Sequence, residues 1–295
     1  MTVDLACGEL AFVDLTFPGL DALPAAGEER HSRDFLRSPG GAAITAVGAA
    51  RLGLSVALVS PIGADADGDF LRTTLAADGV RWAGRTVART AVTAVLPIDG
   101  DRAMATFDPG EQVTAAELAA VAPRAAILSL PRLGIAPPGA RLYATAGDAE
   151  ARGGLPALDG VHALLVNERE ARLLTGAADA PAAARQLGEH VPRVIVTLGP
   201  RGALELTGGE LVTAPGIPNG PAVDTTGAGD LFAAAYVWAD LHGAAAPERL
   251  RWAVLYAALS VRVATAVAGA ATFDELVEAG ARHGLTWVPI EEEVR

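Results

Sequence analysis

Short apolar segments alternate with helix-like segments in the second half of this chain, and this alternation constrains the fold more than any other feature. The strand candidates are residues 125–130, 142–144, 163–166 and 194–197. The helix candidates around them are residues 114–121, 168–174 and 180–190. Short strands that are apolar throughout are typical of a sheet buried on both faces. The pattern therefore predicts an α/β fold with a doubly wound, mostly parallel sheet.

Residues 1–110 follow a less regular pattern. We expect one opening strand over residues 3–13, interrupted by Gly8 and Glu9. Residues 17–38 are rich in proline, glycine and charge, and Asp99-Gly100 is a strong hairpin signal. These two regions predict a second, smaller sheet. The other expected elements are hairpin strands over 92–97 and 102–107, a strand over 55–59, and helices over 40–52, 68–78, 230–243 and 248–265.

Charge and residue usage exclude several kinds of site. The 35 acidic residues outnumber the 23 basic ones and give a net charge of −12, so we expect no nucleic-acid partner. The chain contains no lysine, which excludes a P-loop lysine, a Schiff-base lysine and a pyridoxal phosphate site. Cys7 is the single cysteine, and the five histidines are scattered. An internal disulfide, a cysteine zinc site and a histidine metal cluster are therefore not expected.

Residues 252–273 are the one stretch that is long and apolar enough to be tested as a membrane span. Arg262 lies near its centre, where a charge costs about 2.5–3.5 kcal/mol on insertion scales. We therefore expect a buried helix followed by a strand or loop, and no membrane partner. The N-terminus carries Asp4 and no basic residues, so it does not resemble a signal peptide, and we expect a cytoplasmic protein.

The string DTTGAGD at residues 224–230 carries the clearest chemical signal. Its small residues let the backbone approach a ligand closely, and an apolar run follows it. A helix that starts at or just after Gly229 would point unpaired N–H groups at that ligand and would favour an anion. A carboxylate such as Asp230 also suits the first turn of an ordinary helix. The string alone leaves both interpretations open.

Further segments complete a pattern. They are residues 8–14, GGAAIT at 40–45 running on to ARLG at 50–53, IGADADG at 62–68, NERE at 167–170 and TLGPRGA at 197–203. Together with residues 224–230, and in this order, they resemble the signatures of the ribokinase-like carbohydrate kinases, the PfkB family. The resemblance covers nearly the whole chain. It implies one kinase domain over residues 1–295, with a three-layer α/β core and a small β-sheet lid formed by segments of about 15–38 and 90–107.

The resemblance also implies an activity, which is ATP-dependent phosphorylation of a hydroxyl group on a sugar or sugar acid. Asp230 would be the general base, and the backbone of Gly227, Ala228 and Gly229 would form an anion hole. Glu170 would act on Mg²⁺ through its water shell. The residues implied for the nucleotide are Asn167, Thr197, Gly199, Gly202, Thr225, Gly227 and Gly229. Those implied for the acceptor are Asp14, Gly40, Gly41, Thr45 and Asp230.

The chain departs from the family pattern at two places. Thr45 stands where the first signature usually has asparagine. The segment LYATAGD at residues 142–148 lacks the aspartate that similar sugar kinases commonly carry on the corresponding central strand. Two alternatives therefore stay open: a nucleoside kinase of the same fold, and a non-catalytic relative that binds a sugar or nucleotide. A Rossmann-type dehydrogenase is disfavoured because no GxGxxG follows the first strand.

Three finer expectations follow from the resemblance alone. Residues 256–259 and 266–270 would border the adenine. Asp224 and Thr226 would be the residues to contact a monovalent cation, as they do in some relatives. Pairing of lid sheets in similar kinases makes a homodimer plausible.

Overall fold

The main sheet of the protein has the strand order β15-β14-β13-β12-β11-β10-β1-β4-β6. The computed structural model describes residues 2–98 and 101–288. The strands are β1 (Val3–Cys7), β4 (Val56–Leu58), β6 (Arg81–Trp82), β10 (Pro123–Ser129), β11 (Arg141–Thr145), β12 (Val161–Asn167), β13 (Arg193–Thr197), β14 (Gly202–Thr207) and β15 (Glu210–Pro215). All neighbours pair in parallel except β13 with β14 and β14 with β15. The predicted doubly wound, mostly parallel α/β fold is therefore confirmed.

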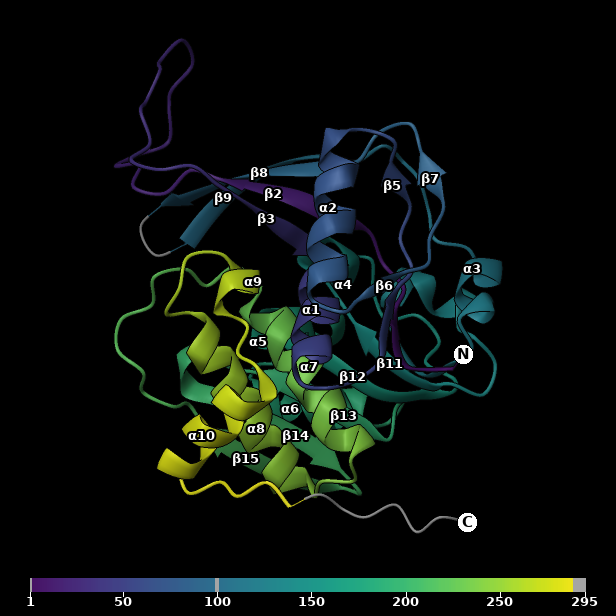
Figure 1. The fold of residues 1–295 in the computed structure, drawn as a ribbon. Helices are drawn as coiled ribbons and strands as arrows, with labels where there is room; N and C mark the ends of the chain where they lie inside the picture. Colours follow the sequence, from purple (N-terminus) through teal and green to yellow (C-terminus); the bar gives the residue numbers. More distant parts are fainter. Residues whose placement is uncertain (1, 99–100, 289–295) are drawn as a thin grey trace.

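Helices cover both faces of this sheet (Figure 1). They are α1 (Ala42–Arg51), α2 (Ala66–Ala77), α3 (Ala115–Ala120), α4 (Asp148–Arg152), α5 (Glu168–Thr175), α6 (Ala180–Leu187), α7 (Ala228–Leu241), α8 (Ala246–Ser260), α9 (Ala266–Gly269) and α10 (Phe273–Arg282), with short 3₁₀ turns η1 (Leu130–Ile135) and η2 (Gly199–Arg201). Successive strand residues serve opposite faces. Ile127 packs in the core under α1, α7 and α8, whereas Leu128 packs in the core under α3, α5 and α6.

A second sheet of four strands lies apart from the main sheet (Figure 1). Its order is β3-β2-β8-β9, with β2 (Ala11–Thr16), β3 (Leu36–Gly41), β8 (Ala91–Ile98) and β9 (Asp101–Phe107). A short pair, β5 (Ile62–Gly63) and β7 (Thr86–Val87), lies beside α2 (Figure 1). Strands β8 and β9 pair as the predicted antiparallel hairpin. The turn expected at Asp99-Gly100 lies outside the described residues.

Two expectations about individual elements are wrong, and one hairpin was not predicted. The opening strand is two strands, because the chain leaves the main sheet at Gly8, where a Cβ would lie 2.4 Å from Leu128, and joins the second sheet as β2. The helix expected to reach residue 265 ends at Ser260, because the backbone turns and Thr265 takes a positive φ of 69°. The hairpin of β14 and β15 is not predicted, although Gly208-Gly209, both at positive φ, is a typical hairpin turn.

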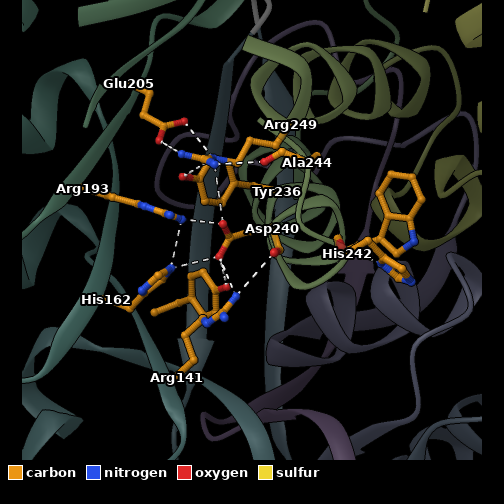
Figure 2. A network of polar contacts seen from close by, with 11 residues as sticks. Arg141, His162, Arg193, Glu205, Tyr236, Asp240, His242, Ala244 and Arg249 are labelled. Atoms are coloured by element: carbon orange, nitrogen blue, oxygen red, sulfur yellow. Dashed lines mark hydrogen bonds and ion pairs between the residues drawn. The ribbon is translucent and has the colours of Figure 1, made fainter. Parts of the chain in front are cut away.

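Helix α7 is fixed at its C-terminal end by a buried ionic network (Figure 2). The carboxylate of Asp240 accepts hydrogen bonds from Tyr143, from Arg193 and, at 3.2 Å, from Arg141. His162 Nε2 lies 2.9 Å from the same carboxylate. These partners start β11, β12 and β13, so the network ties the end of α7 to the amino ends of three parallel strands. No helix among residues 2–98 and 101–288 is long and apolar enough to cross a membrane.

Candidate active site

The candidate site lies at the opposite edge of the main sheet, where the parallel strands end. Strands β1, β10, β12 and β13 end there at Cys7, Ser129, Asn167 and Thr197. A cavity of about 770 Å³ opens at these residues, and Phe12 of the second sheet lines it as well. Ligands of open α/β sheets bind at the carboxyl ends of the strands. The cavity is therefore where the topology predicts a ligand.

The loop that precedes α7 forms one wall of this cavity. Gly227 takes a left-handed conformation (φ 71°, ψ 4°), and a Cβ atom there would lie 2.4 Å from a neighbouring side chain. Helix α7 begins at Ala228, one residue earlier than predicted. The N–H groups of Gly229 and Asp230 lie in the first turn, where the helix gives them no partner, whereas that of Ala228 lies 3.4 Å from the Thr225 carbonyl oxygen. The wall therefore presents helix N–H groups that favour an anion.

Two carboxyl groups approach the cavity from different elements. Asp230 lies in the first turn of α7, and Asp14 lies within β2 with 8% of its surface exposed. Burial raises the pKa of Asp230 to about 6. Burial, with the charges of Asp230 and Asp224, raises the pKa of Asp14 to about 6 as well. A carboxylate with a pKa near 6 is ionised at neutral pH and still basic enough to accept a proton.

Glycine and threonine residues shape the space around this pair. A Cβ on Gly40 would lie 2.3 Å from the carboxyl group of Asp14, so this residue must lack a side chain. Gly41 has a φ of 58° and precedes α1. The hydroxyl of Thr45, on α1, lies 3.4 Å from Asp230 Oδ1. Of the five residues that the sequence predicts for the acceptor, Gly41, Thr45 and Asp230 line the cavity, and Asp14 and Gly40 contact each other beside it.

A second carboxylate pair lies at the start of α4 and α5. Glu170 accepts a hydrogen bond of 2.8 Å from the Asn167 N–H group, and Glu150 accepts one of 2.8 Å from the Gly147 N–H group. Both glutamates line the cavity. Burial, together with the charges of Asp148 and Glu150, raises the pKa of Glu170 to about 7. A cation held between the two glutamates would relieve this repulsion.

These residues fit a magnesium ion that is only partly coordinated by protein. Among the described residues no group of three or more histidine, cysteine, aspartate or glutamate side chains is placed to hold a metal. Mg²⁺ is usually bound by one or two carboxylates together with substrate phosphates and water. Glu170 and Glu150 match this requirement. Glu150 was not predicted, although its position three residues after Gly147 repeats the spacing of Asn167 and Glu170.

A second cavity of about 660 Å³ adjoins the first. Its walls are largely apolar and come from the segment after β15 and from α8. They include Gly202, Gly216, Ile217, Pro218, Val254, Ala257, Ala258 and Val261. Such a surface suits a flat ring system. Of the two segments predicted to border an adenine, residues 257 and 258 line this cavity, and none of residues 266–270 does.

Polar residues that the sequence analysis did not single out also line the first cavity. Glu9 follows β1, and its carboxylate accepts hydrogen bonds from the Ser129 N–H group at 3.0 Å and from Arg132 Nε at 2.6 Å. Arg102 reaches the cavity from β9 of the second sheet. The signal for Glu9 and Ser129 was their position at the carboxyl ends of two parallel strands, since Ser129 ends β10 and Glu9 follows β1 by two residues. Arg102 carried no such signal, because a lone arginine in a hairpin strand is an ordinary surface residue.

Asp224 holds the loop before α7 in place. Its carboxylate oxygens accept hydrogen bonds from the N–H groups of Thr226, at 2.8 Å, and Thr265, at 3.0 Å. The Thr226 hydroxyl is buried and without a hydrogen-bond partner in the described chain. A cation needs several oxygen ligands, and these two residues offer one that is not already bonded. These hydrogen bonds give Asp224 a structural role, and each of its oxygens keeps a lone pair. A monovalent cation at Asp224 and Thr226 stays a prediction.

A family model described as "pfkB family carbohydrate kinase" matches residues 4–127 and 141–272 of the chain. A curated ribokinase from Arabidopsis thaliana is 39% identical over 119 residues, which is 37% of this chain. The match spans 31% of that relative's own length, about a third.

Solved structures share the fold over nearly the whole chain. Arabidopsis thaliana ribokinase complexed with ribose and ATP superposes with a TM-score of 0.78 and 23% identity, covering 95% of this chain and 99% of that one. Ribokinase from Thermotoga maritima gives a TM-score of 0.80 and 22% identity over 94% and 99%. Adenosine kinase from Sinorhizobium meliloti gives 0.77 and 19% over 95% and 99%. At these identities the likeness establishes the fold.

Proposed function

The chain belongs to the pfkB family of carbohydrate kinases, and from this premise we propose that it transfers the γ-phosphoryl group of ATP to a hydroxyl group of a sugar or sugar acid. One observation carries the proposal. The Asp230 carboxylate and the N–H groups at the start of α7 face the same cavity, and that cavity adjoins a second, apolar one. A base for the acceptor, a cradle for phosphates and a pocket for a base ring are thus adjacent.

Asp230 accepts the proton of the attacking hydroxyl group in this proposal. Its raised pKa of about 6 supports the role, because proton acceptance is most efficient when the base has a pKa near the working pH. Asp14, Gly40, Gly41 and Thr45 hold the acceptor beside it. Thr45 offers one hydroxyl where an asparagine side chain would offer both a donor and an acceptor, which favours acceptors other than ribose.

Backbone groups carry most of the phosphate contacts. Phosphoryl transfer depends on positioning and on stabilising charge, and N–H groups that point at the transferred group supply both. We assign the phosphate contacts to the N–H groups of Gly227 and Gly229. The Ala228 N–H group contributes less, because it already lies 3.4 Å from the Thr225 carbonyl oxygen. The residues proposed for the rest of the nucleotide are Asn167, Thr197, Gly199, Gly202 and Thr225. All of these except Gly202 line the first cavity, and Gly202 lines the second.

Glu170, assisted by Glu150, would hold Mg²⁺ beside the phosphates. The ion supplies positive charge to the phosphate oxygens when it is bound. The proposal does not include a monovalent cation. The second sheet acts as a lid that excludes water from the acceptor end.

The wider setting of the proposed enzyme follows from the same residues. An ATP-dependent reaction needs a compartment that holds ATP, so the proposal includes a cytoplasmic location. The second sheet exposes the apolar side chains of Met104 and Phe107, and Phe35 is exposed just before β3. A homodimer that covers them is part of the proposal and is checked by light scattering in solution.

The test is ADP release from Mg-ATP in the presence of pentoses, hexoses, keto-sugar acids and nucleosides. Asp230→Asn is measured beside Asp274→Asn, which changes an exposed aspartate in the first turn of α10. We expect release that depends on one acceptor class, falls in Asp230→Asn by about a hundredfold or more, and persists in Asp274→Asn. Nucleoside-dependent release would favour a nucleoside kinase. No release with any acceptor, together with no rise in melting temperature on adding ATP, would overturn the proposal.

A further inference from the structure

The two cavities meet along a short boundary. The described residues that line both of them are Arg102, Thr197, Gly199, Thr225, Gly229 and Phe232. The proposed function assigns four of these six, Thr197, Gly199, Thr225 and Gly229, to the nucleotide, and Gly229 to its phosphates. The boundary is therefore where the proposed γ-phosphoryl group lies, between the acceptor and the apolar pocket. Arg102 is the one charged side chain among the six.

The charge balance of the site leaves a need for a cation at this boundary. Triphosphates are strongly anionic, and the side chains of Glu150, Glu170 and Asp230 that line the first cavity are acidic. The chain has no lysine. Arg102 and Arg132 are the cationic side chains among the described residues that line the cavities, and of these two Arg102 lines both cavities.

Arg102 also acts on the two carboxyl groups of the acceptor end. Its positive charge lowers the pKa of Asp14 and of Asp230, against the effect of burial. Arg102 and Asp230 line the same cavity, so this charge acts on the Asp230 carboxyl group across the cavity. Arg102 lies on β9, where it pairs with Pro97 of β8, so it belongs to the second sheet. That sheet lies apart from the main sheet (Figure 1), and its residues Phe12 and Arg102 line the first cavity.

We propose that Arg102 is a catalytic residue of the phosphoryl transfer, delivered to the transferred group by the second sheet. This inference rests on the proposed function. In the step, the acceptor oxygen forms a bond to the γ-phosphorus of ATP. The bond from that phosphorus to the oxygen bridging the β-phosphate breaks, and ADP leaves with the electron pair. Asp230 takes the hydroxyl proton. The planar guanidinium group of Arg102 donates hydrogen bonds to the γ-phosphoryl oxygens as the transfer proceeds.

Delivery by the second sheet links catalysis to closure of the site. The base and the N–H groups of the α7 turn belong to the main body, whereas Arg102 belongs to the part that covers the acceptor. A site without an acceptor, and with the sheet displaced, would lack this cation beside the γ-phosphoryl group. The arrangement would therefore limit ATP hydrolysis in the absence of acceptor.

The test compares Arg102→Gln and Arg102→Lys with the wild type. We expect kcat to fall by about a hundredfold or more in Arg102→Gln, because arginines that contact a transferred phosphoryl group contribute at least this much. Arg102→Lys should recover part of the loss, and the KM for the acceptor should change by less than about threefold. The acidic limb of the pH profile should move upward in Arg102→Gln, since a charge that lowers the pKa of Asp230 is lost.

The matched control is Arg89→Gln. Arg89 is an exposed arginine just before β8 whose guanidinium packs over the Phe107 ring at 5.0 Å, and it does not line either cavity. We expect it to keep the wild-type kcat. A second measurement uses ADP with aluminium fluoride and acceptor, which mimics the transferred group. Arg102→Gln should bind this mixture about tenfold more weakly and bind ADP alone as the wild type does.

The outcomes separate the two proposals. An active wild type with a kcat in Arg102→Gln within threefold of its own would overturn the role of Arg102 and leave the proposed function standing. A large loss in Arg102→Gln with no recovery in Arg102→Lys and an unmoved pH profile would indicate a structural role instead. A wild type without acceptor-dependent ADP release would overturn the proposed function and this inference with it.

Discussion

Helix α7 carries a carboxylate near each end, and the surroundings shift the pKa values of the two in opposite directions. Asp230, in the first turn, lies 3.4 Å from the Thr45 hydroxyl, and burial raises its pKa to about 6. Asp240, in the last turn, is also buried. Hydrogen bonds from His162 and Tyr143 and the charge of Arg193 outweigh the effect of burial and hold its pKa well below the usual range (Figure 2). An aspartate can therefore take up a proton near neutral pH at one edge of the sheet, whereas an aspartate at the other edge stays ionised.

The comparison indicates that the Asp240 end of α7 stabilises the fold, whereas the Asp230 end provides groups proposed for the reaction. The network at Asp240 joins α7 to β11, β12 and β13 and continues through Arg249 to the fully buried Glu205. Its charges are satisfied, so it fixes the helix and offers nothing to a ligand. At the Asp230 end, a carboxylate with a raised pKa and N–H groups that have no partner within the helix face a cavity. Binding groups at a site often reduce stability, and an anchor at the other end of the same helix offsets that cost.

The largest expected contrast comes from Asp230→Asn. We expect kcat to fall by about a hundredfold or more, because the general base is lost. The same change should leave the melting temperature equal or higher, since ionised Asp230 is poorly paired and costs folding energy at neutral pH. Activity assays and thermal unfolding at pH 7 check both parts. A loss of stability as large as that of Asp240→Asn would contradict the division.

Asp240→Asn should show the reverse behaviour. We expect a loss of about 3 kcal/mol in unfolding free energy, because removing one partner of a buried ion pair leaves the arginines uncompensated. The kcat of the protein that remains folded should stay within about threefold of wild type, since Asp240 lies at the far end of α7 from the site. Urea unfolding measures the loss. The control is Asp69→Asn on α2, an exposed i,i+3 pair with Arg72, where about 0.5 kcal/mol or less is expected.

The sequence supported these two ends unequally. The DTTGAGD string is contiguous, so one short segment predicted the turn, the start of α7 and the position of Asp230. The Asp240 network draws on Arg141, His162, Arg193 and Arg249, which are separated by many residues. They meet because β11, β12 and β13 are neighbours and because α8, which carries Arg249, packs against α7. No local pattern announces such a cluster.

The same distinction explains the errors in the predicted fold. Alternating strands and helices are local patterns, and the main parallel strands and most helices were predicted near their observed positions. The split of the opening strand at Gly8 depends on packing against Leu128, which lies 120 residues away. The position of Arg102 at the boundary of the two cavities could not be predicted either, because it depends on how the second sheet packs in the tertiary structure.

Lowering the pH should separate activity from folding. Protonation of the coupled pair Asp14 and Asp230, each with a pKa of about 6, should reduce kcat/KM by about tenfold between pH 7.5 and pH 5. The fold should persist there. The stabilising contribution of Asp240 is present above the unfolded pKa of about 3.9 and is lost only as the pH falls toward its depressed folded value. Raised groups such as Asp230 have the opposite sign and cost stability as the pH rises between about 4 and 6.

The measurement for this prediction pairs a pH–rate profile with circular dichroism at each pH. Asp14→Asn provides the comparison, because removing one of the two carboxyl groups should leave a limb with a single protonation step at a lower pH. Activity and helical signal that disappear together between pH 6 and pH 5 would show that unfolding, and not protonation at the site, causes the loss.

The smallest expected effect concerns the Thr45 hydroxyl, which bonds to Asp230. Thr45→Val removes the hydroxyl and keeps the shape, and it should change kcat by about threefold or less, because a contact of 3.4 Å is a weak hydrogen bond. The pKa of Asp230 should rise slightly in the pH–rate profile, since that contact lowers it. The equivalent removal at the other end, Tyr143→Phe, takes away a short hydrogen bond to Asp240 and should cost more stability than Thr45→Val. Equal losses of stability in the two variants would mean that the Thr45 contact is as strong as the Tyr143 bond, and that Asp230 is not the underpaired end of the helix.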